Sequence, residues 1–319
     1  MRRFLLLAVC LTAFSQAFPQ AGVEKGESGE NERYCYLDNG NVRIGVDLEG
    51  GGCVFYFAES STGRNLLNHA DKGRYVQQSY YGIDDGSLWG KTPWCWNPVQ
   101  GGGYRHSPAT ILESRLKRRS LRIRTRPKHW ASSEDITDAV MEETITLEGN
   151  VAHIHYRFVY DGTVSHPVKA QELPAVFVDY ALANLVVYDG DRPWTNDRLT
   201  RVVPGWPNEY RRSEECWAAY VDDDGWGIGV WFPGTVEMTA YRFEGPSGPQ
   251  GSGCSYFAPI KQFAITPGLE YEYDVYLTIG RVDEIRATVY RLHRKELAAR
   301  RAKGRKKLTV SDESTFKYA

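Results

Sequence analysis

The chain has 319 residues, of which 13% are aromatic, and its formal net charge is −1. A charge this close to zero gives no general attraction to nucleic acid, and the sequence contains no nucleic-acid-binding motif. The apolar run at residues 4–14 is shorter than the roughly 20 residues that a membrane-spanning helix needs. We therefore expect a globular protein whose mature form binds neither nucleic acid nor a membrane.

The N-terminus has the pattern of an export signal. Arg2 and Arg3 precede the apolar run, and small residues near Ala17 offer a cleavage point. We therefore expect residues 1–17 to be a signal peptide and the protein to be secreted, either outside the cell or into a periplasm. Residues 18–33 are rich in Gly and Glu and are predicted to form a disordered leader.

Alternating apolar and polar residues predict β-strands along most of the remaining chain. The clearest strands are at residues 41–48, 53–57, 121–126, 153–160, 227–232 and 271–279. In the segment 153–160, Ile154 and Phe158 should share one face with Tyr156, and His153 and His155 should lie on the other. The two histidines could contribute to a metal site, although a plain sheet surface is the favoured interpretation.

Helical spacing is clear only at residues 282–301, and residues 302–319 are polar. We therefore predict an all-β fold, a large two-sheet antiparallel sandwich with a short C-terminal helix. Residues 34–293 should form this single domain, and residues 294–319 should be a basic helix end and a polar tail.

Five cysteines follow the predicted signal peptide, and an odd number leaves at least one without a partner in the chain. An oxidising compartment permits disulfides, but the spacing assigns no pairs. No Cys-x-x-Cys pair, phosphate-binding loop or other metal or cofactor motif is present, so we expect no metal site and no cofactor. The cysteines are Cys35, Cys53, Cys95, Cys216 and Cys254.

Two long irregular stretches, at residues 68–104 and 172–212, interrupt the strands and are rich in Gly, Pro, Trp and Asn. Such loops are often functional. Sugars are bound by aromatic rings that stack on their CH faces and by amide and guanidinium groups that bond their hydroxyls. The alternative is that these residues cap turns or fill the core. The candidate substrate-binding residues are Arg74, Gln78, Tyr81, Trp96, Asn97, Gln100, Trp194 and Trp217.

A series of short motifs runs through the chain after the leader. They are DNGNV (38–42), GG (51–52), NLLN (65–68), DKGR (71–74), QELPA (171–175), YDG (188–190), WAAYVD (217–222), GVWFP (229–233) and YLTIG (276–280). Together they resemble the galactose-mutarotase-like superfamily. That resemblance implies a supersandwich with a concave sugar-binding face, in a superfamily of epimerases, hydrolases, lyase domains and binding domains.

One departure from that superfamily concerns its epimerases. A true aldose epimerase has an acid histidine in an Asn/Thr-His-x-Tyr-Phe-Asn stretch, and the nearest counterpart here is His166-Pro167-Val168-Lys169. Because this counterpart lacks the Phe-Asn, the sequence does not favour simple mutarotation.

Carboxyl groups in the second irregular stretch are candidates for glycoside hydrolysis, which needs an acid with a raised pKa and a second carboxylate. Glu172 is the first candidate, because the apolar residues that follow it could bury its carboxyl group. Glu215, or its neighbour Glu214, is the proposed partner. Asp71 and Asp179 are weaker candidates, and for each acid the alternative is a salt bridge or a loop cap.

Elimination from a uronic sugar needs other groups. The uronate carboxylate would be neutralised by Arg74, Asn97 or Gln100, and a proton would be removed by Tyr80, Tyr81 or His106. The same residues in isolation are often structural.

Arginines at 122, 124 and 126 should share one face of a strand. This face could attract a polyanion, but pairing with acids such as Glu142 and Glu143 on an outer sheet surface is favoured. We therefore predict a secreted enzyme that cleaves glycosidic bonds of a polysaccharide or oligosaccharide, with hydrolysis ahead of elimination. The alternatives are a non-catalytic carbohydrate-binding protein and an aldose-epimerase-like enzyme.

Overall fold

The computed structural model describes residues 33–68, 73–245 and 252–313. The predicted signal peptide, nearly all of the predicted leader, Asp71 and the last six residues lie outside the described residues. Within the described ranges, no helix is long and apolar enough to cross a membrane. The five cysteines that follow the predicted signal peptide lie in these ranges, and none of them forms a disulfide there.

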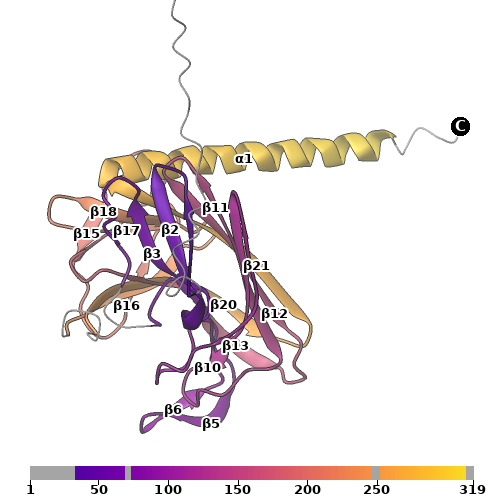
Figure 1. The fold of residues 1–319 in the computed structure, drawn as a ribbon. Coiled ribbons are helices and arrows are strands. Elements are labelled where there is room, and N and C mark those ends of the chain that lie inside the picture. Colours follow the sequence, from indigo (N-terminus) through magenta and orange to yellow (C-terminus); the bar gives the residue numbers. More distant parts are fainter. Residues whose placement is uncertain (1–32, 69–72, 246–251, 314–319) are drawn as a thin grey trace, which may run out of the picture.

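Two large antiparallel sheets dominate the fold (Figure 1). The seven-stranded sheet contains, in spatial order, β10 (Lys128–His129), β7 (Pro98–Val99), β4 (Gln77–Ser79), β13 (His166–Val178), β20 (Cys254–Ile265), β19 (Glu237–Phe243) and β16 (Glu209–Arg212). The nine-stranded sheet contains β15 (Thr200–Val202), β14 (Asn184–Val187), β17 (Trp217–Val221), β18 (Trp226–Trp231), β21 (Leu269–Arg281), β12 (Val151–Tyr160), β11 (Ala139–Glu148), β9 (Ser120–Arg126) and β8 (Thr110–Lys117).

Two smaller sheets complete the architecture. One contains β1 (Tyr34–Asp38), β2 (Val42–Asp47) and β3 (Cys53–Glu59), with the 3-10 turn η1 (Leu48–Gly50) between the last two. The other is a hairpin of β5 (Asp84–Trp89) and β6 (Thr92–Cys95), which projects from one end of the molecule (Figure 1). The predicted two-sheet antiparallel sandwich is confirmed.

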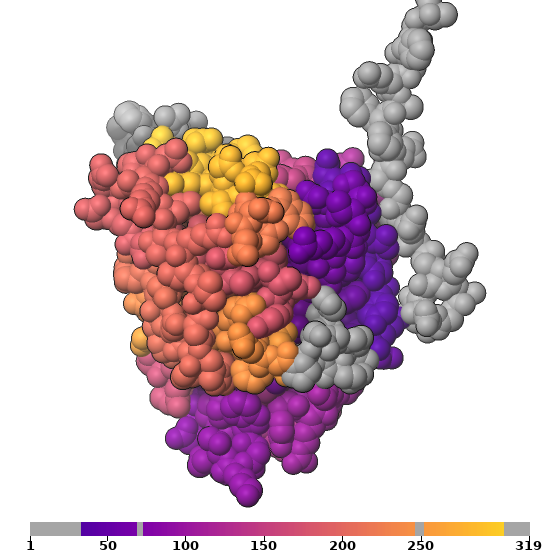
Figure 2. All heavy atoms as spheres, turned by 90° about the vertical axis from the view of Figure 1, so that its left-hand side faces the viewer, coloured from indigo at the N-terminus to yellow at the C-terminus, as the bar shows by residue number. Residues whose placement is uncertain are grey.

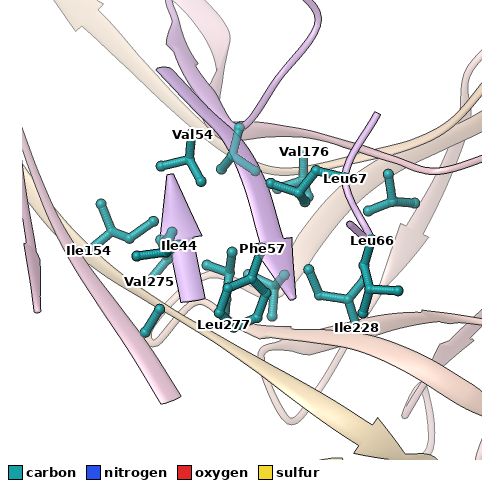
Figure 3. Close-up of a cluster of buried hydrophobic side chains, with 14 of the residues drawn as sticks. Ile44, Val54, Phe57, Leu66, Leu67, Ile154, Val176, Ile228, Val275 and Leu277 are labelled. Carbon is teal, nitrogen blue, oxygen red and sulfur yellow. The ribbon is translucent and has the colours of Figure 1, made fainter. Parts of the chain in front are cut away.

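The main core lies where the two large sheets and the three-stranded sheet face one another. Its members are fully or almost fully buried and come from all three sheets. Figure 3 shows part of this cluster, including Ile44, Phe57, Val176, Ile154 and Leu277. The side chains of β12 alternate as predicted, with Ile154, Tyr156 and Phe158 fully buried. Burial of one face of each strand therefore fixes the register of the sandwich.

The outer surface of the nine-stranded sheet carries paired charges. His153 and His155 both contact Asp274 Oδ1, at 2.7 and 3.0 Å. Arg122 and Arg124 donate to the Glu142 carboxylate at 2.9 and 3.0 Å, so this arginine face is paired as favoured from the sequence. No group of three or more His, Cys, Asp or Glu side chains in the described ranges is arranged to hold a metal ion.

Glu143 does not belong to that outer surface, because it points into the interior, where it is 1% exposed. Its expected pairing with the arginines is wrong, since consecutive residues of a strand face opposite sides. Burial raises the pKa of Glu143 to about 8, and a hydrogen bond from Gln100 Nε2 at 3.1 Å opposes this rise. The carboxyl group is therefore protonated at neutral pH.

Helix α1 (Val282–Glu313) begins where predicted but continues twelve residues past the predicted end. The first turns of this extension are rich in Lys and Arg, which are good helix formers, and carry the helix on despite Gly304. Its first half docks on β17, β18 and β21 through Ile285, Val289 and Leu292, and its second half runs past the sheets (Figure 1). The helix is therefore long, and not short as expected.

The buried carboxyl of Glu143 predicts a pH-dependent stability. Its pKa is about 8 in the folded protein and near 4.5 in the unfolded chain. Its contribution to the free energy of unfolding is therefore fully present below pH 4.5. That contribution is lost as pH rises towards 8, because the folded protein must then bury a charge. Urea unfolding of wild type and Glu143→Gln across this range should show wild type losing free energy of unfolding relative to the variant. Parallel curves would contradict this assignment.

Candidate functional site

A cavity of about 410 Å³ opens on the face of the seven-stranded sheet that is turned away from the core. We call this face the open face. Its floor is aromatic: Tyr256 lies directly opposite Phe177 on one neighbouring strand and opposite Tyr241 on the other. The ring centroids are 4.7 and 4.4 Å apart, respectively. Cross-strand neighbours share a face, so the rings form one continuous surface.

Two aromatic walls flank this floor. The first contains Trp89 and Trp94 of the β5–β6 hairpin together with Trp130, and Trp89 lies 5.1 Å from Trp94 and 6.2 Å from Trp130 between ring centroids. The second contains Trp206, which packs edge-on against Phe243 at 5.0 Å and against Tyr241. Figure 2 shows early residues, including the hairpin, as the lower tip of one face, with later residues above them. Distant parts of the sequence therefore build one cavity.

Polar contacts hold the first wall in place. His129 Nδ1 accepts from the backbone amides of Ala131 and Ser132, at 3.1 and 3.2 Å, so its Nε2 carries the proton and donates to Asp85 of the hairpin at 2.8 Å. Asn97 accepts from the Trp94 indole at 3.1 Å. The hairpin and the loop that carries Trp130 are thereby fixed to the body of the sandwich.

Glu172 lies on the floor of this cavity, in strand β13, and is half-buried. The Tyr256 hydroxyl donates to its Oε1 at 2.6 Å. Burial raises the pKa of Glu172, and hydrogen bonds from Tyr256, Tyr81 and Ser79 limit the rise. The side chain can therefore exchange a proton or donate a hydrogen bond nearer neutral pH than an ordinary glutamate.

A β-bulge aims two parts of β13 at the same face. Glu172 is paired with Ile260 of β20, and Val176 is paired with Phe257. Between these two pairs, β13 has one residue more than β20. The extra residue shifts the alternation, so that both Glu172 and Phe177 point to the open face. Without it, one of the two would point into the core.

Four of the predicted site residues meet in this cavity: Arg74, Tyr81, Asn97 and Glu172. Arg74 stacks over the Trp130 ring at 4.1 Å. Most of the aromatic lining is not among the residues predicted from the sequence. Trp89, Trp94 and Trp206 lie in the two irregular stretches and could have been found there, whereas Trp130, Tyr241 and Tyr256 gave no separate signal.

Four other predicted residues lie on the interior side of the same region. Tyr80 is fully buried and stacks on Phe158 at 4.0 Å. Gln78 donates to the Glu142 backbone oxygen at 3.0 Å, and Gln100 donates to Glu143. Trp96 stacks on His166. Strand alternation explains the first two, because Gln77, Ser79 and Tyr81 take the open face and the residues between them take the core. We assign these four no role in the cavity.

Three further predicted residues lie beneath helix α1, on the other sheet. Glu215 is fully buried and accepts hydrogen bonds from Arg286 at 2.8 Å and from the Trp217 indole at 2.9 Å. The Trp194 backbone amide also donates to it, at 2.9 Å. Burial alone would raise the pKa of Glu215, but its hydrogen bonds outweigh burial and lower it. Glu215, Trp194 and Trp217 thus anchor the helix and do not reach the cavity.

The remaining candidates lie elsewhere. His106 is exposed and lines a small hollow beside Arg74 and Trp130, outside the aromatic cavity. Glu214 pairs with Arg212 at 2.7 Å. Asp179 accepts from the Ala181 backbone amide at 2.8 Å and caps a turn, as the alternative interpretation expected.

Comparison with solved structures shows the fold. A galactose mutarotase-like protein from Lactobacillus casei superposes with a TM-score of 0.52 at 9% sequence identity, covering 77% of this chain and 99% of that one. A proposed aldose 1-epimerase from Escherichia coli K12 gives 0.50 at 11% identity, covering 77% and 98%. The Slr1438 protein from Synechocystis sp. PCC 6803 gives 0.50 at 13%, covering 78% and 96%. The chain has the galactose mutarotase-like fold, as its motifs indicated.

No family model and no curated protein matches the sequence of the chain. The fold is therefore shown at an identity too low to transfer an activity.

The position of Glu215 makes a testable prediction about stability. Glu215→Ala leaves the Arg286 guanidinium buried without its carboxylate, so we expect a loss of about 3 kcal/mol in the free energy of unfolding. Glu214→Ala, which removes an acid paired with an exposed arginine, should cost at most about 1 kcal/mol. Denaturant unfolding of both variants measures this difference. A Glu215→Ala variant of wild-type stability would show that the buried pair does not anchor the helix.

Proposed function

We propose that the protein binds a saccharide in the aromatic cavity of its open face. The observation that carries this proposal is the pair of aromatic walls standing over a floor that combines rings with hydrogen-bonding groups. Pyranose rings present apolar CH faces and a rim of hydroxyls, and this cavity offers a matching partner for each. The galactose mutarotase-like fold, whose solved examples include a proposed aldose 1-epimerase, supports a carbohydrate ligand.

The polar groups of the floor suit sugar hydroxyls. Gln77, Ser79 and Tyr81 line the cavity beside Glu172 and can donate and accept hydrogen bonds. Asn97 also lines it, but its amide is already bonded to Trp94, Ser79 and the Tyr80 backbone oxygen. At neutral pH the raised pKa of Glu172 gives this carboxyl a larger protonated fraction than an exposed glutamate has. Neutral groups are desolvated at lower cost than charges, which favours exchange of water for sugar hydroxyls.

Glycosidic hydrolysis loses support from the placement of the carboxyl groups. Among the described residues that line the cavity, Glu172 is the only acid, and Glu215 is committed to helix α1. Two carboxyl groups across one bond are needed for the usual mechanism. Of the residues predicted for uronate elimination, Arg74, Asn97 and Tyr81 line the cavity, whereas Gln100, Tyr80 and His106 do not. Binding is therefore the function that the geometry supports best, and export through residues 1–17 is part of this proposal.

A second candidate is an aldose-epimerase-like enzyme, which opens and closes a sugar ring by proton transfer. It is favoured by one observation, the carboxyl group of Glu172 with a raised pKa and tyrosine partners. The histidine nearest in sequence to the epimerase pattern, His166, stacks on Trp96 and does not line the cavity. Binding therefore stands ahead of epimerisation.

The binding proposal is tested with a panel of soluble polysaccharides: amylose, xylan, mannan, a β-glucan, polygalacturonate and alginate. Retardation in gels containing each polymer identifies the ligand, and quenching of tryptophan fluorescence gives Kd. Trp206 is 58% exposed at the cavity, so Trp206→Ala should weaken binding about tenfold, equivalent to about 1.4 kcal/mol. Trp194→Ala, on the other sheet, should leave Kd unchanged. Equal Kd values for wild type and Trp206→Ala would contradict the site.

Glu172→Gln separates the two candidates. The amide keeps the shape and a hydrogen bond to Tyr256 but cannot exchange a proton, so binding should change less than about threefold. An epimerase would accelerate the anomerisation of free aldoses, measured by NMR, and this acceleration would vanish in the variant. We expect no acceleration by wild type. A rate enhancement that Glu172→Gln abolishes would replace the binding proposal with epimerisation.

A further inference from the structure

A second hollow, of about 430 Å³, lies on the seven-stranded sheet beyond the aromatic cavity. It is lined by side chains from β13, β16, β19 and β20, among them Ala170, Tyr210, Arg212, Glu237, Ile260 and Gln262. Neither the sequence motifs nor the proposed cavity includes it.

The register places most of the side chains of this second hollow on the open face; the exceptions are Arg211 and its cross-strand partner Met238, which face the core side. Ile260 is the cross-strand partner of Glu172, and Gln262 is the partner of Ala170. Directly opposed residues lie on the same side of a sheet, and so do residues two apart in one strand. Ala170, Ile260 and Gln262 therefore point to the same side as Glu172.

The same argument applies to the outer strand of the sheet. Tyr210 of β16 is the partner of Thr239, which is two residues from Tyr241 in β19. Tyr241 in turn opposes Tyr256, which lines the aromatic cavity. Tyr210 therefore stands on the open face, on the strand at its edge.

The two hollows come close to each other at the cross-strand pair of Glu172 and Ile260. Glu172 lines the aromatic cavity, whereas its partner Ile260 lines the second hollow. The Cβ atoms of directly opposed residues are about 5 Å apart. The cavity and the second hollow therefore lie next to each other along β13 and β20, where one extended ligand could reach both.

The second hollow repeats the chemistry of the first. The Tyr210 side chain is 75% exposed, and Ile260 adds apolar surface near it. Gln262 supplies an amide. Arg212 already donates to Glu214 at 2.7 Å, and Arg211 donates to Glu209 at 2.6 Å, so these cations are neutralised and do not mark an anion site. An aromatic platform with neutral polar groups again suits a pyranose.

We propose that the ligand is an internal stretch of a glycan chain, with sugar units in the aromatic cavity, past Glu172, and in the second hollow. A free monosaccharide would occupy only one of the two sections, since each has the size of a small-ligand pocket. This inference rests on the proposed function and names its substrate class, an oligosaccharide or polysaccharide. One of the protein's subsites for this chain, at Tyr210, lies outside the aromatic cavity.

The test uses the full-length mature protein and an oligosaccharide series, from monosaccharide to octasaccharide, of each polymer in the panel above. Calorimetry or tryptophan fluorescence gives Kd for each length. Affinity should rise with length beyond the disaccharide. In Tyr210→Ala, Kd for the octasaccharide should increase about tenfold, whereas Kd for the disaccharide should change less than about twofold. Tyr210→Phe keeps the ring and should behave as wild type, and Leu112→Ala, an exposed apolar residue of β8, controls for nonspecific surface effects.

The outcomes separate this inference from the proposed function. A monosaccharide that binds as tightly as the octasaccharide, with no effect of Tyr210→Ala, overturns this inference but leaves a sugar in the aromatic cavity. Weaker octasaccharide binding in Trp206→Ala but not in Tyr210→Ala also overturns it. If no member of the panel or the series binds, the proposed function fails and this inference fails with it.

Discussion

The alternation of side chains between the two faces of the seven-stranded sheet is the constraint on which the rest of the structure depends. One side of each central strand packs into the core, with Val176 and Phe257 fully buried there. The other side carries the floor of the cavity, with Phe177 and Tyr256 next to them in sequence. Any slip of one residue would exchange the two sets. The hydrophobic core therefore fixes the register that also places Glu172, and the bulge after Glu172 is the one departure from alternation that the site needs.

The interior beneath the cavity is polar as well as apolar, and this explains several misplaced sequence assignments. Three polar residues lie between the sheets: Gln78, Gln100 and Glu143. Gln78 donates to the backbone oxygen next to Glu143, and Gln100 donates to the Glu143 carboxyl group. Buried polar groups need partners, so an interior of this kind requires the same amides and hydroxyls that a sugar site requires. Composition alone cannot separate the two uses. The two uses differ only in the face of the strand on which the residue lies. Strand β4, with three residues, is too short for its sequence to show which face that is.

The parts that the sequence predicted well are those with long periodic patterns. The ten residues of β12 show which face is buried, and the first turns of α1 show their helical spacing. The parts it could not predict depend on contacts between distant segments. Arg286 meets Glu215 across 71 positions, and Trp130 meets Trp89 across a hairpin that is bonded to His129 through Asp85. The irregular stretches supply many of the residues that line the cavity, but the partners of each residue come from the tertiary fold.

The central claim is that a glycan lies against the walls and floor of the open face, and the indole NH signals of the protein report on it directly. The nine tryptophans divide into those that line the cavity, Trp89, Trp94, Trp130 and Trp206, and those elsewhere. Titration of ¹⁵N-labelled protein with a bound oligosaccharide should shift the signals of the first group. It should leave Trp194, Trp217 and Trp231, which surround helix α1, unchanged. Shifts confined to these three, with the cavity signals unmoved, would contradict the account.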